Sequence, residues 1–244
     1  MNELPLSGKT VLITGSARRV GRMLALACAQ AGADIIIHHG HSGAQAAELQ
    51  ETIRALGRKA WVVAADLNDL AQAQNLVPQA VRLSPIYALV NSAAIFGEGT
   101  VLDTPLGDWT RHLNINLTSP FLLSQAFARQ AAQGTEGCIV NVLDWRALRP
   151  ESEHFAYTVS KSALAAMTKS LAAALAPTIR VNGLALGAIL PPAGEPANPE
   201  LILKIPLARW GTEAELAHAL LFLLTRASYI TGEIIHLDGG RHLS

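Results

Sequence analysis

Charged side chains are scarce in this sequence, and neither sign is in excess. Asp, Glu, Lys and Arg make up 16% of the 244 residues, with 19 acidic and 19 basic side chains. The chain therefore lacks the positive excess that nucleic acid or an anionic membrane attracts, and we expect neither as a partner. Cysteine is also rare: Cys28 and Cys138 each fall inside an apolar run. This excludes a disulfide framework and indicates buried free thiols in a reducing compartment.

Long apolar runs and targeting signals are lacking too. No run reaches the roughly 20 residues that a membrane helix needs. Residues 1–7 have no basic region followed by an apolar core, so we expect no signal peptide and a cytoplasmic location. Half of the residues are hydrophobic, which is enough to build a large core. The length suits one domain covering residues 1–244.

Short apolar runs alternate with amphipathic segments along the whole chain. This pattern predicts an α/β fold: a Rossmann-like, doubly wound parallel sheet with helices on both faces. Seven runs are expected to be strands: 10–14, 34–38, 60–65, 86–90, 138–143, 179–186 and 232–237. Helices are expected from the first glycine turn to Gly32 and over 43–56, 69–82, 106–133, about 152–176, and 212–225. A stretch rich in Gly and Pro, about 187–203, is expected to be a substrate loop.

The first expected strand ends in a glycine turn that leads into a helix. Gly15 would allow the tight turn, and Gly21 would let the helix pack close to the strand, as in a dinucleotide-binding βαβ unit. Arg18, Arg19 and Arg22 crowd the positive end of this helix, which is unfavourable unless anions neutralise them. A pyrophosphate or a ribose phosphate would do so. Any one arginine could equally point into water, but for the cluster we favour anion binding.

The second expected strand ends without an acidic residue. An acid at this place would hold a ribose 2′-hydroxyl and repel a 2′-phosphate. The segment His38-His39-Gly40-His41-Ser42 instead offers three imidazoles and a hydroxyl, which suit a phosphate, so NADP(H) is favoured over NAD(H). A metal site is the alternative reading of the histidines. No cysteine or acid stands nearby, and we expect no metal.

Tyr157 and Lys161 lie four residues apart on an expected helix, so their side chains share one face. An ammonium beside a phenol favours the phenolate and lowers the tyrosine pKa from about 10, which allows proton transfer near neutral pH. Asp144 follows a strand and could reach the phenol. Asn116 is a poor helix former. Either it lies on a solvated face, or it or the backbone it disturbs holds water near Lys161. The Tyr-Lys pair alone is common on ordinary helices, so the other motifs decide.

The chain resembles a short-chain dehydrogenase/reductase over essentially its whole length. The resemblance rests on Thr14-Gly15-(x)5-Gly21, Asn91-Ser92-Ala93, Asn116, Tyr157-(x)3-Lys161 and Asp238-Gly239-Gly240. Two residues depart from the common pattern: Arg19 replaces the middle glycine of the phosphate loop, and Asp144 replaces the catalytic serine. Both departures are similar to the pteridine reductases and the bacterial dihydromonapterin reductases. Phe96 matches their aromatic residue that sandwiches the pterin against nicotinamide.

This resemblance implies NADPH-dependent reduction of a pterin: a dihydropteridine, dihydromonapterin, dihydrobiopterin or dihydrofolate. It implies catalytic roles for Asp144, Tyr157, Lys161 and Asn116, with Tyr157 as proton donor. It implies cofactor contacts for Gly15, Arg18, Arg19, Val20, Gly21, His38, His41, Ser42, Asp66, Leu67, Asn91, Ser92, Ala93, Tyr157, Lys161, Gly187 and Ile189. It implies substrate contacts for Arg19, Phe96, Asp144, Trp145, Tyr157 and Leu190. Members of this family usually form dimers or tetramers through the two long helices, so self-association is expected.

The aspartate itself bears on the substrate. A serine suits hydrogen bonding to a ketone oxygen, whereas the Asp144 carboxylate would repel a developing alkoxide and suits a ring with N–H donors. The alternative is a carbonyl reductase on the same fold, acting on a 3-oxoacyl group or another ketone. A non-enzymatic NADP-binding regulator is a further alternative, although it would not need the intact Tyr157 and Lys161. Trp145, Arg146 and Arg149 either serve an anionic substrate tail or form a solvated rim, and we favour the rim.

Overall fold

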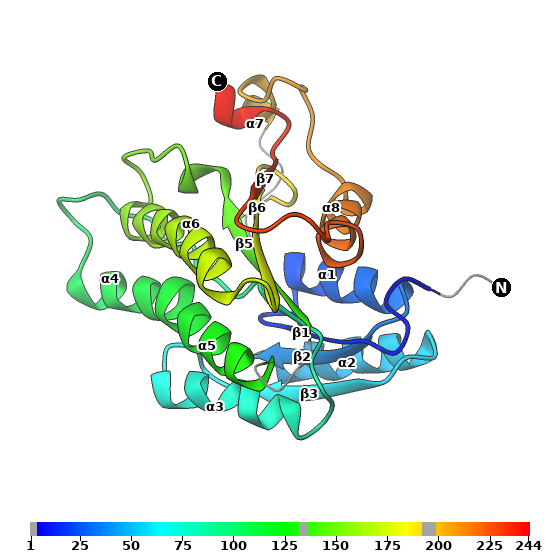
Figure 1. Cartoon of the computed structure of the whole chain (residues 1–244). Coiled ribbons are helices and arrows are strands. Elements are labelled where there is room, and N and C mark those ends of the chain that lie inside the picture. Colours follow the sequence, from blue (N-terminus) through cyan, green and yellow to red (C-terminus); the bar gives the residue numbers. More distant parts are fainter. Residues whose placement is uncertain (1–3, 132–135, 192–198) are drawn as a thin grey trace.

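Seven parallel strands form one sheet at the centre of the molecule. A computed structural model describes residues 4–131, 136–191 and 199–244 (Figure 1). The strand order is β3-β2-β1-β4-β5-β6-β7, which reverses direction between β1 and β4. The strands are β1 (Thr10–Ile13), β2 (Asp34–His39), β3 (Ala60–Ala64), β4 (Ala88–Asn91), β5 (Gly137–Asp144), β6 (Ile179–Leu186) and β7 (Ile234–Leu237). The predicted single Rossmann-like domain is confirmed, and ligands bind such sheets where the strand order reverses.

Helices cover both faces of the sheet (Figure 1). The α-helices are α1 (Arg19–Gln30), α2 (Gly43–Ala55), α3 (Leu70–Val81), α4 (Leu106–Leu113), α5 (Ser119–Ala131), α6 (Phe155–Leu175), α7 (Pro199–Leu203) and α8 (Glu213–Thr225). The first, second and eighth pack on one face, and α3, α5 and α6 pack on the other. Local signals fix their starts: the Asp69 side chain caps α3, and Thr212 with Glu215 forms a capping box on α8.

Alternate residues of each strand feed two separate cores. Val11 and Ile13 belong to the core under α1, α2 and α8, whereas Leu12 belongs to the core under α3, α5 and α6. Ile35 and Ile36 divide in the same way. Both faces of the sheet are therefore buried from solvent. For this reason its strands are continuous apolar runs and do not alternate between apolar and polar residues.

Three features differ from the sequence prediction. The expected helix 106–133 is interrupted by a π-helical turn, Asn114–Thr118, between α4 and α5. The expected substrate loop contains α7, and its residues 192–198 lie outside the described part of the chain. Two short 3₁₀ turns, Trp145–Ala147 and Arg241–Leu243, had no sequence signal that we recognised.

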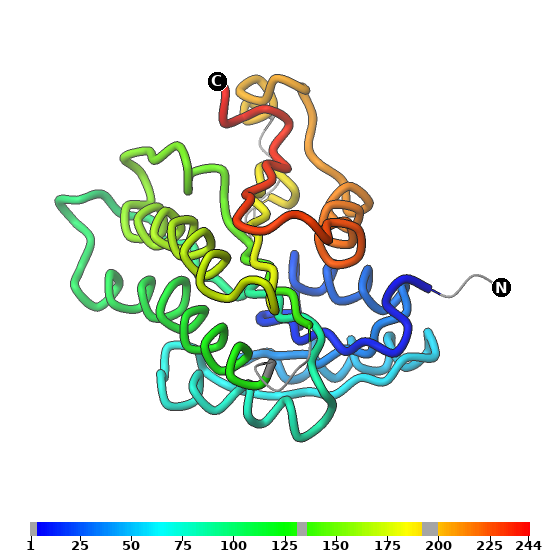
Figure 2. Tube along the Cα trace, in the orientation of Figure 1, coloured from blue at the N-terminus to red at the C-terminus, as the bar shows by residue number. Residues whose placement is uncertain are grey.

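The C-terminal turn closes back on the molecule. Figure 2 shows the chain ending next to α7, and there the Ser244 hydroxyl donates to the Lys204 carbonyl at 2.9 Å. Within the described ranges, no helix combines the length and the apolarity needed to span a bilayer. The C-terminal turn lies near the end of β5, where the candidate catalytic residues begin.

Candidate active site

A cleft of about 880 Å³ opens where the strand order reverses, at the carboxyl ends of the strands. Most of the expected cofactor contacts line it: Gly15, Arg18, Arg19, Val20, Gly21, His38, His41, Ser42, Asp66, Leu67, Ser92 and Ala93. Arg111 also lines it and was missed, because nothing in its local sequence separates it from an ordinary solvated helix residue. The lining residues come from the carboxyl ends of four strands, β1, β2, β3 and β4. A dinucleotide that lies across the sheet needs a cleft of this kind.

The floor of the cleft depends on close backbone packing. Gly15 has φ +65°, and a Cβ there would lie 2.9 Å from the Ala93 Cα. A Cβ on Gly21 would overlap the carbonyl oxygen of Gly15. The Thr14 hydroxyl oxygen accepts hydrogen bonds from the amides of Ser92 (2.9 Å) and Ala93 (3.0 Å), which ties the end of β1 to the end of β4. The glycine turn therefore fits the expected dinucleotide cradle.

His38 does not have the phosphate-binding role expected of it. Its Nδ1 accepts a hydrogen bond from the Gly15 amide at 3.0 Å, and its Nε2 faces the Ala65 carbonyl at 2.9 Å and so carries the proton. Burial lowers its pKa to about 4, which keeps the ring neutral. Both ring nitrogens are thus occupied, one by the glycine turn and the other by the residue that follows β3. His41 and Ser42 line the cleft, and His41 is exposed to solvent.

The three arginines of the glycine turn separate in the structure. Arg22 forms an ion pair with Glu48 at 2.9 Å and does not line the cleft. Arg18 and Arg19 line it, so two of the three cations remain at the expected anion site. Arg19 has φ +53°, a conformation that favours glycine, and its guanidinium donates to the Pro191 carbonyl at 2.6 Å. A glycine at this position would adopt this backbone without strain.

Tyr157 and Asp144 meet as expected, but the tyrosine pKa moves in the opposite direction. The Tyr157 hydroxyl donates to the Asp144 carboxylate at 3.2 Å. Burial raises the pKa of Tyr157 well above 10, and the negative charge of Asp144 raises it further. The expectation of a lowered pKa is wrong for this structure, because burial and the carboxylate raise the pKa, and the charge that opposes them is that of Arg146 and not that of Lys161.

Lys161 is held under the tyrosine by the backbone. Its Nζ donates to the Val142 carbonyl at 2.8 Å and lies 5.9 Å from the centre of the Tyr157 ring. Complete burial lowers its pKa to about 8, although the Asp144 carboxylate opposes this shift. The ammonium is therefore within reach of the site but makes no hydrogen bond to the phenol in the described structure.

Asn116 lies in the π-helical turn and is completely buried, which excludes the solvated-face alternative. Its Oδ1 accepts from the Ile95 amide at 3.0 Å, and its Nδ2 donates to the Ile95 carbonyl at 3.1 Å and to the Ser160 hydroxyl at 3.0 Å. π-Helical turns are frequent at functional sites. Here the turn joins the segment after β4 to α6, which carries Tyr157.

An exposed aromatic ring stands beside the tyrosine. Phe96 is 52% exposed, and its ring centre lies 4.8 Å from that of Tyr157 in an edge-on arrangement. The His154 ring stacks on Phe96 at 4.0 Å. His154 was missed by sequence reasoning, since its role depends on a left-handed backbone (φ +52°) just before α6. The exposed part of the Phe96 ring is an apolar surface of the kind on which flat rings stack.

The remaining expected contacts lie deeper or further away. Trp145 is 2% exposed, so its ring offers a substrate almost no surface, and this corrects its expected role. Asn91 points into the sheet, where its Nδ2 donates to the Asn141 side chain at 2.8 Å. Gly187 packs against the Asp238 backbone, and Ile189 is buried. Leu190 is partly buried. Among the described residues, no group of three or more His, Cys, Asp or Glu side chains could hold a metal ion.

Known proteins match this arrangement over nearly the whole chain. A family model described as "Enoyl-(Acyl carrier protein) reductase" matches residues 15–242. The 3-oxoacyl-[acyl-carrier-protein] reductase FabG of Aquifex aeolicus is 37% identical, over 98% of this chain and 99% of its own length. This chain is a short-chain dehydrogenase/reductase.

Solved reductases of this family add the cofactor. FolM Alternative dihydrofolate reductase 1 from Brucella canis, complexed with NADP, superposes with a TM-score of 0.90 at 34% identity and covers 100% of this chain and 97% of its own. A short chain dehydrogenase from Burkholderia cenocepacia in complex with NADP has a TM-score of 0.91 at 31% identity, over 98% and 99%. The protein is thus an NADP-dependent oxidoreductase. The cationic glycine turn fits such a dinucleotide.

Proposed function

We propose that this reductase uses NADPH to reduce a dihydropterin. One observation carries the proposal: the tyrosine hydroxyl is hydrogen-bonded to a carboxylate, at Asp144, beside the exposed Phe96 ring. A carboxylate next to the proton donor disfavours an alkoxide and accepts hydrogen bonds from ring N–H groups. The exposed aromatic ring gives a flat heterocycle a surface on which to stack.

The described residues divide the reaction as follows. Arg18, His41 and Ser42 bind the phosphates of the dinucleotide, which supplies the hydride when bound. The pterin ring stacks on Phe96, and the Asp144 carboxylate accepts hydrogen bonds from the N–H groups of the pterin. Tyr157 donates its proton to the ring nitrogen next to the carbon that receives the hydride, so the C=N bond becomes CH–NH. A positioned acid of this kind contributes about 10²–10⁴ in rate.

The supporting residues fix this geometry. Lys161 holds the nicotinamide ribose, and Asn116 keeps the segment before Phe96 attached to α6. Arg19 borders the pterin on the side of the cofactor. Leu190 borders it on the side of the expected substrate loop, about 187–203. Gly187 and Ile189 approach the nicotinamide. The likeness to the Brucella protein, whose name is alternative dihydrofolate reductase 1, supports the pterin assignment.

The second candidate is reduction of a 3-oxoacyl group or another ketone. The specific observation in its favour is the 37% identity with the Aquifex aeolicus 3-oxoacyl-[acyl-carrier-protein] reductase over nearly both chains. Against it stands Asp144, whose negative charge would oppose the developing alkoxide.

A direct comparison of substrates tests the proposal. Purified enzyme with NADPH is given dihydrobiopterin, dihydrofolate or an acetoacetyl thioester, and NADPH oxidation is followed by absorbance. We expect turnover of the dihydropterins to exceed that of the thioester by at least tenfold. The Asp144→Ser variant is expected to reverse this order. A wild-type enzyme that prefers the thioester would establish the ketone as substrate.

We also propose that the enzyme works in the cytoplasm as a dimer or tetramer. The two cysteines are buried free thiols, which suits a reducing compartment. Self-association would use the outer surfaces of α4, α5 and α6, where apolar side chains are exposed.

A further inference from the structure

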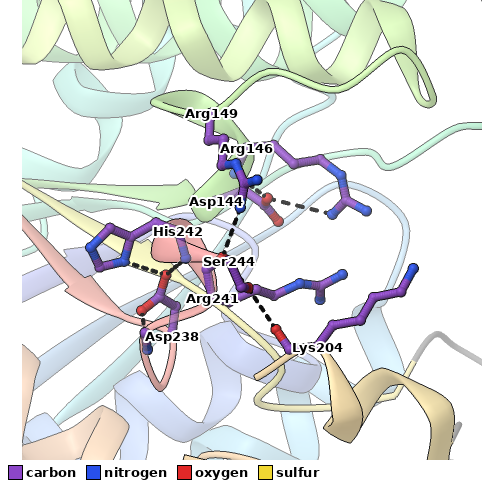
Figure 3. A network of polar contacts seen from close by, with 9 residues as sticks. Asp144, Arg146, Arg149, Lys204, Asp238, Arg241, His242 and Ser244 are labelled. Atoms are coloured by element: carbon purple, nitrogen blue, oxygen red, sulfur yellow. Dashed lines mark hydrogen bonds and ion pairs between the residues drawn. The ribbon is translucent and has the colours of Figure 1, made fainter. Parts of the chain in front are cut away.

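Two arginine side chains rest on one buried tryptophan next to the catalytic carboxylate. The guanidinium carbon of Arg146 lies 4.7 Å from the centre of the Trp145 ring, and that of Arg241 lies 4.3 Å from it. Trp145 follows β5, whereas Arg241 comes from the C-terminal turn. Figure 3 shows both guanidinium groups extended to the same side, beyond Asp144. The fold thus brings two cations from distant parts of the chain to the edge of the active site.

Arg241 has no acceptor for its charged head. The residue is 9% exposed, yet its guanidinium makes no hydrogen bond and no ion pair with any residue of 4–131, 136–191 or 199–244. Burial lowers its pKa, and the neighbouring positive charge of Arg146 lowers it further. The cation is largely withdrawn from water, and only the attraction of Glu151, Asp144 and Asp238 from a distance opposes the cost; a directly bound anion would restore more of this free energy.

The nearby acids are already engaged. Asp144 accepts the Tyr157 hydroxyl and faces Arg146 Nη1 at 3.6 Å. Glu151 lies 3.5 Å from Arg146 Nε. Asp238 is held by His242, whose Nδ1 lies 2.8 Å from the carboxylate (Figure 3). These three carboxylates favour the charged form of Arg241 from a distance, but none of them accepts a hydrogen bond from its guanidinium.

The cations lie on the substrate side of the site. Arg146 connects the two regions, because its head lies 5.9 Å from the centre of the exposed Phe96 ring as well as on Trp145. A ligand stacked on Phe96 would therefore direct a substituent past Arg146 toward Arg241. The planar donor fork of arginine matches the two oxygens of a carboxylate.

We propose that Arg241, together with Arg146, binds a carboxylate carried by the substrate at the end opposite to the reduced bond. The inference rests on the proposed function, because it concerns the same site. It adds a substrate class: the enzyme prefers an acidic substrate to a neutral one with the same reacting group. Sequence reasoning had favoured a solvated rim for Arg146. Its low exposure and the unpaired Arg241 favour the anionic tail instead.

Matched substrates and variants test this assignment. Dihydrofolate carries a glutamate tail, and dihydrobiopterin has the same ring with a neutral tail. For Arg241→Met we expect KM for dihydrofolate to rise about tenfold to hundredfold, the effect of losing hydrogen bonds to a charged group. KM for dihydrobiopterin and both kcat values should stay within twofold. Arg241→Lys keeps the charge and should lie between wild type and Arg241→Met. Arg226→Met, at an exposed position after α8, should behave as wild type.

The outcomes separate this inference from the proposed function. If only ketones are turned over, the pterin assignment fails, and acetoacetate compared with its neutral methyl ester then tests Arg241 in the same way. If neither class is turned over, calorimetric binding of folate and biopterin to the NADP⁺-loaded enzyme replaces KM. Equal losses for acidic and neutral ligands in Arg241→Met would mean that Arg241 only packs on Trp145, and the proposal would be overturned.

Discussion

At the scale of single residues, the Asp144 carboxylate determines how Tyr157 handles its proton. A serine at this position would remove the negative charge that raises the pKa of the phenol, and would leave the burial that raises it and the Arg146 charge that lowers it. With Asp144 hydrogen-bonded at 3.2 Å, the phenol is held in its protonated form, its pKa raised by burial and by the carboxylate. A protonated phenol can give a proton but cannot take one. The pair therefore favours reduction over oxidation.

The pH dependence of Asp144→Asn tests this direction. Because the pKa of Tyr157 is raised, the wild-type phenol stays protonated until the pH rises through that high value, so its ionisation should cost no rate below pH 10. A loss of rate near pH 8 that wild type and Asp144→Asn share would belong to Lys161. Asparagine removes the negative charge of Asp144, so the pKa of Tyr157 falls, although burial still raises it. We expect the alkaline limb of kcat to move at least one pH unit lower. The measurement is kcat for NADPH oxidation from pH 6 to 10.5.

Two results bound this prediction. Tyr157→Phe should lose about 10²–10⁴ in kcat at every pH, because the proton donor itself is gone. An alkaline limb at the same pH in wild type and Asp144→Asn would show that the carboxylate does not control the phenol.

Lys161 is placed in the site at a cost to stability. Its pKa is about 8 in the folded chain against an ordinary value of 10.5, so the folded state binds fewer protons than the unfolded state between these values. The penalty is fully present below pH 8 and is relieved as the pH rises to 10.5. It amounts to about 3 kcal/mol. Replacing Lys161 by an apolar residue would remove this penalty. It would also remove the hydrogen bond to the Val142 carbonyl, and this loss offsets about 1–2 kcal/mol of the gain.

We therefore expect Lys161→Met to be more stable than wild type at pH 7 by about 1–2 kcal/mol, or several degrees in Tm, and inactive. The advantage should shrink toward pH 10. Lys169→Met is the matched control, because Lys169 is exposed on the same helix. Thermal unfolding at pH 7 and pH 10 measures both variants. A destabilised Lys161→Met at pH 7 would contradict the prediction.

At the scale of elements, the turn between β1 and α1 depends on a histidine from β2. His38 holds the Gly15 amide and the Ala65 carbonyl, so it organises the turn without facing a phosphate. His38→Ala should therefore weaken binding of NADPH and NADH by the same factor, about tenfold, since the whole turn is loosened. His41→Ala should weaken NADPH alone. Titration of both dinucleotides by fluorescence measures the four affinities.

The two variants serve as controls for each other. If His38→Ala lowers the affinity for NADPH but leaves that for NADH unchanged, then His38 binds the 2′-phosphate directly and the assignment made from its hydrogen bonds is wrong.

The elements also show what a sequence can predict. The strands were predictable because both faces of the sheet are covered, so each strand is an apolar run such as Cys138–Leu143. The Tyr157–Asp144 contact followed from a strand end and the next helix. The pKa of Tyr157 was not predictable, because it depends on how deeply packing buries the ring. The contact between Arg241 and Trp145 joins residues 96 positions apart, and no local pattern indicates it.

At the scale of the whole molecule, the helices α4 and α5 carry exposed apolar side chains. Phe121 on α5 is 41% exposed, and Leu106 at the start of α4 is more exposed still. On α6, small residues such as Ala166 and Ala173 face outward. Small side chains allow a second helix to approach closely, and exposed apolar groups gathered on one face are typical of an interface between subunits. This surface is continuous with the helix that carries Tyr157, so assembly would also stiffen the active site.

A substitution on each side of the sheet tests this assembly. Phe121→Arg should convert the dimer or tetramer into a smaller species, measured by light scattering after gel filtration, because a buried guanidinium without a partner costs several kcal/mol. Leu56→Arg is the matched control: Leu56, after α2 on the opposite face, is 43% exposed and should tolerate the charge. Reduced activity in Phe121→Arg with an unchanged Tm would indicate that subunit contact orders α6. A wild-type monomer, or equal dissociation in both variants, would place no interface on α5.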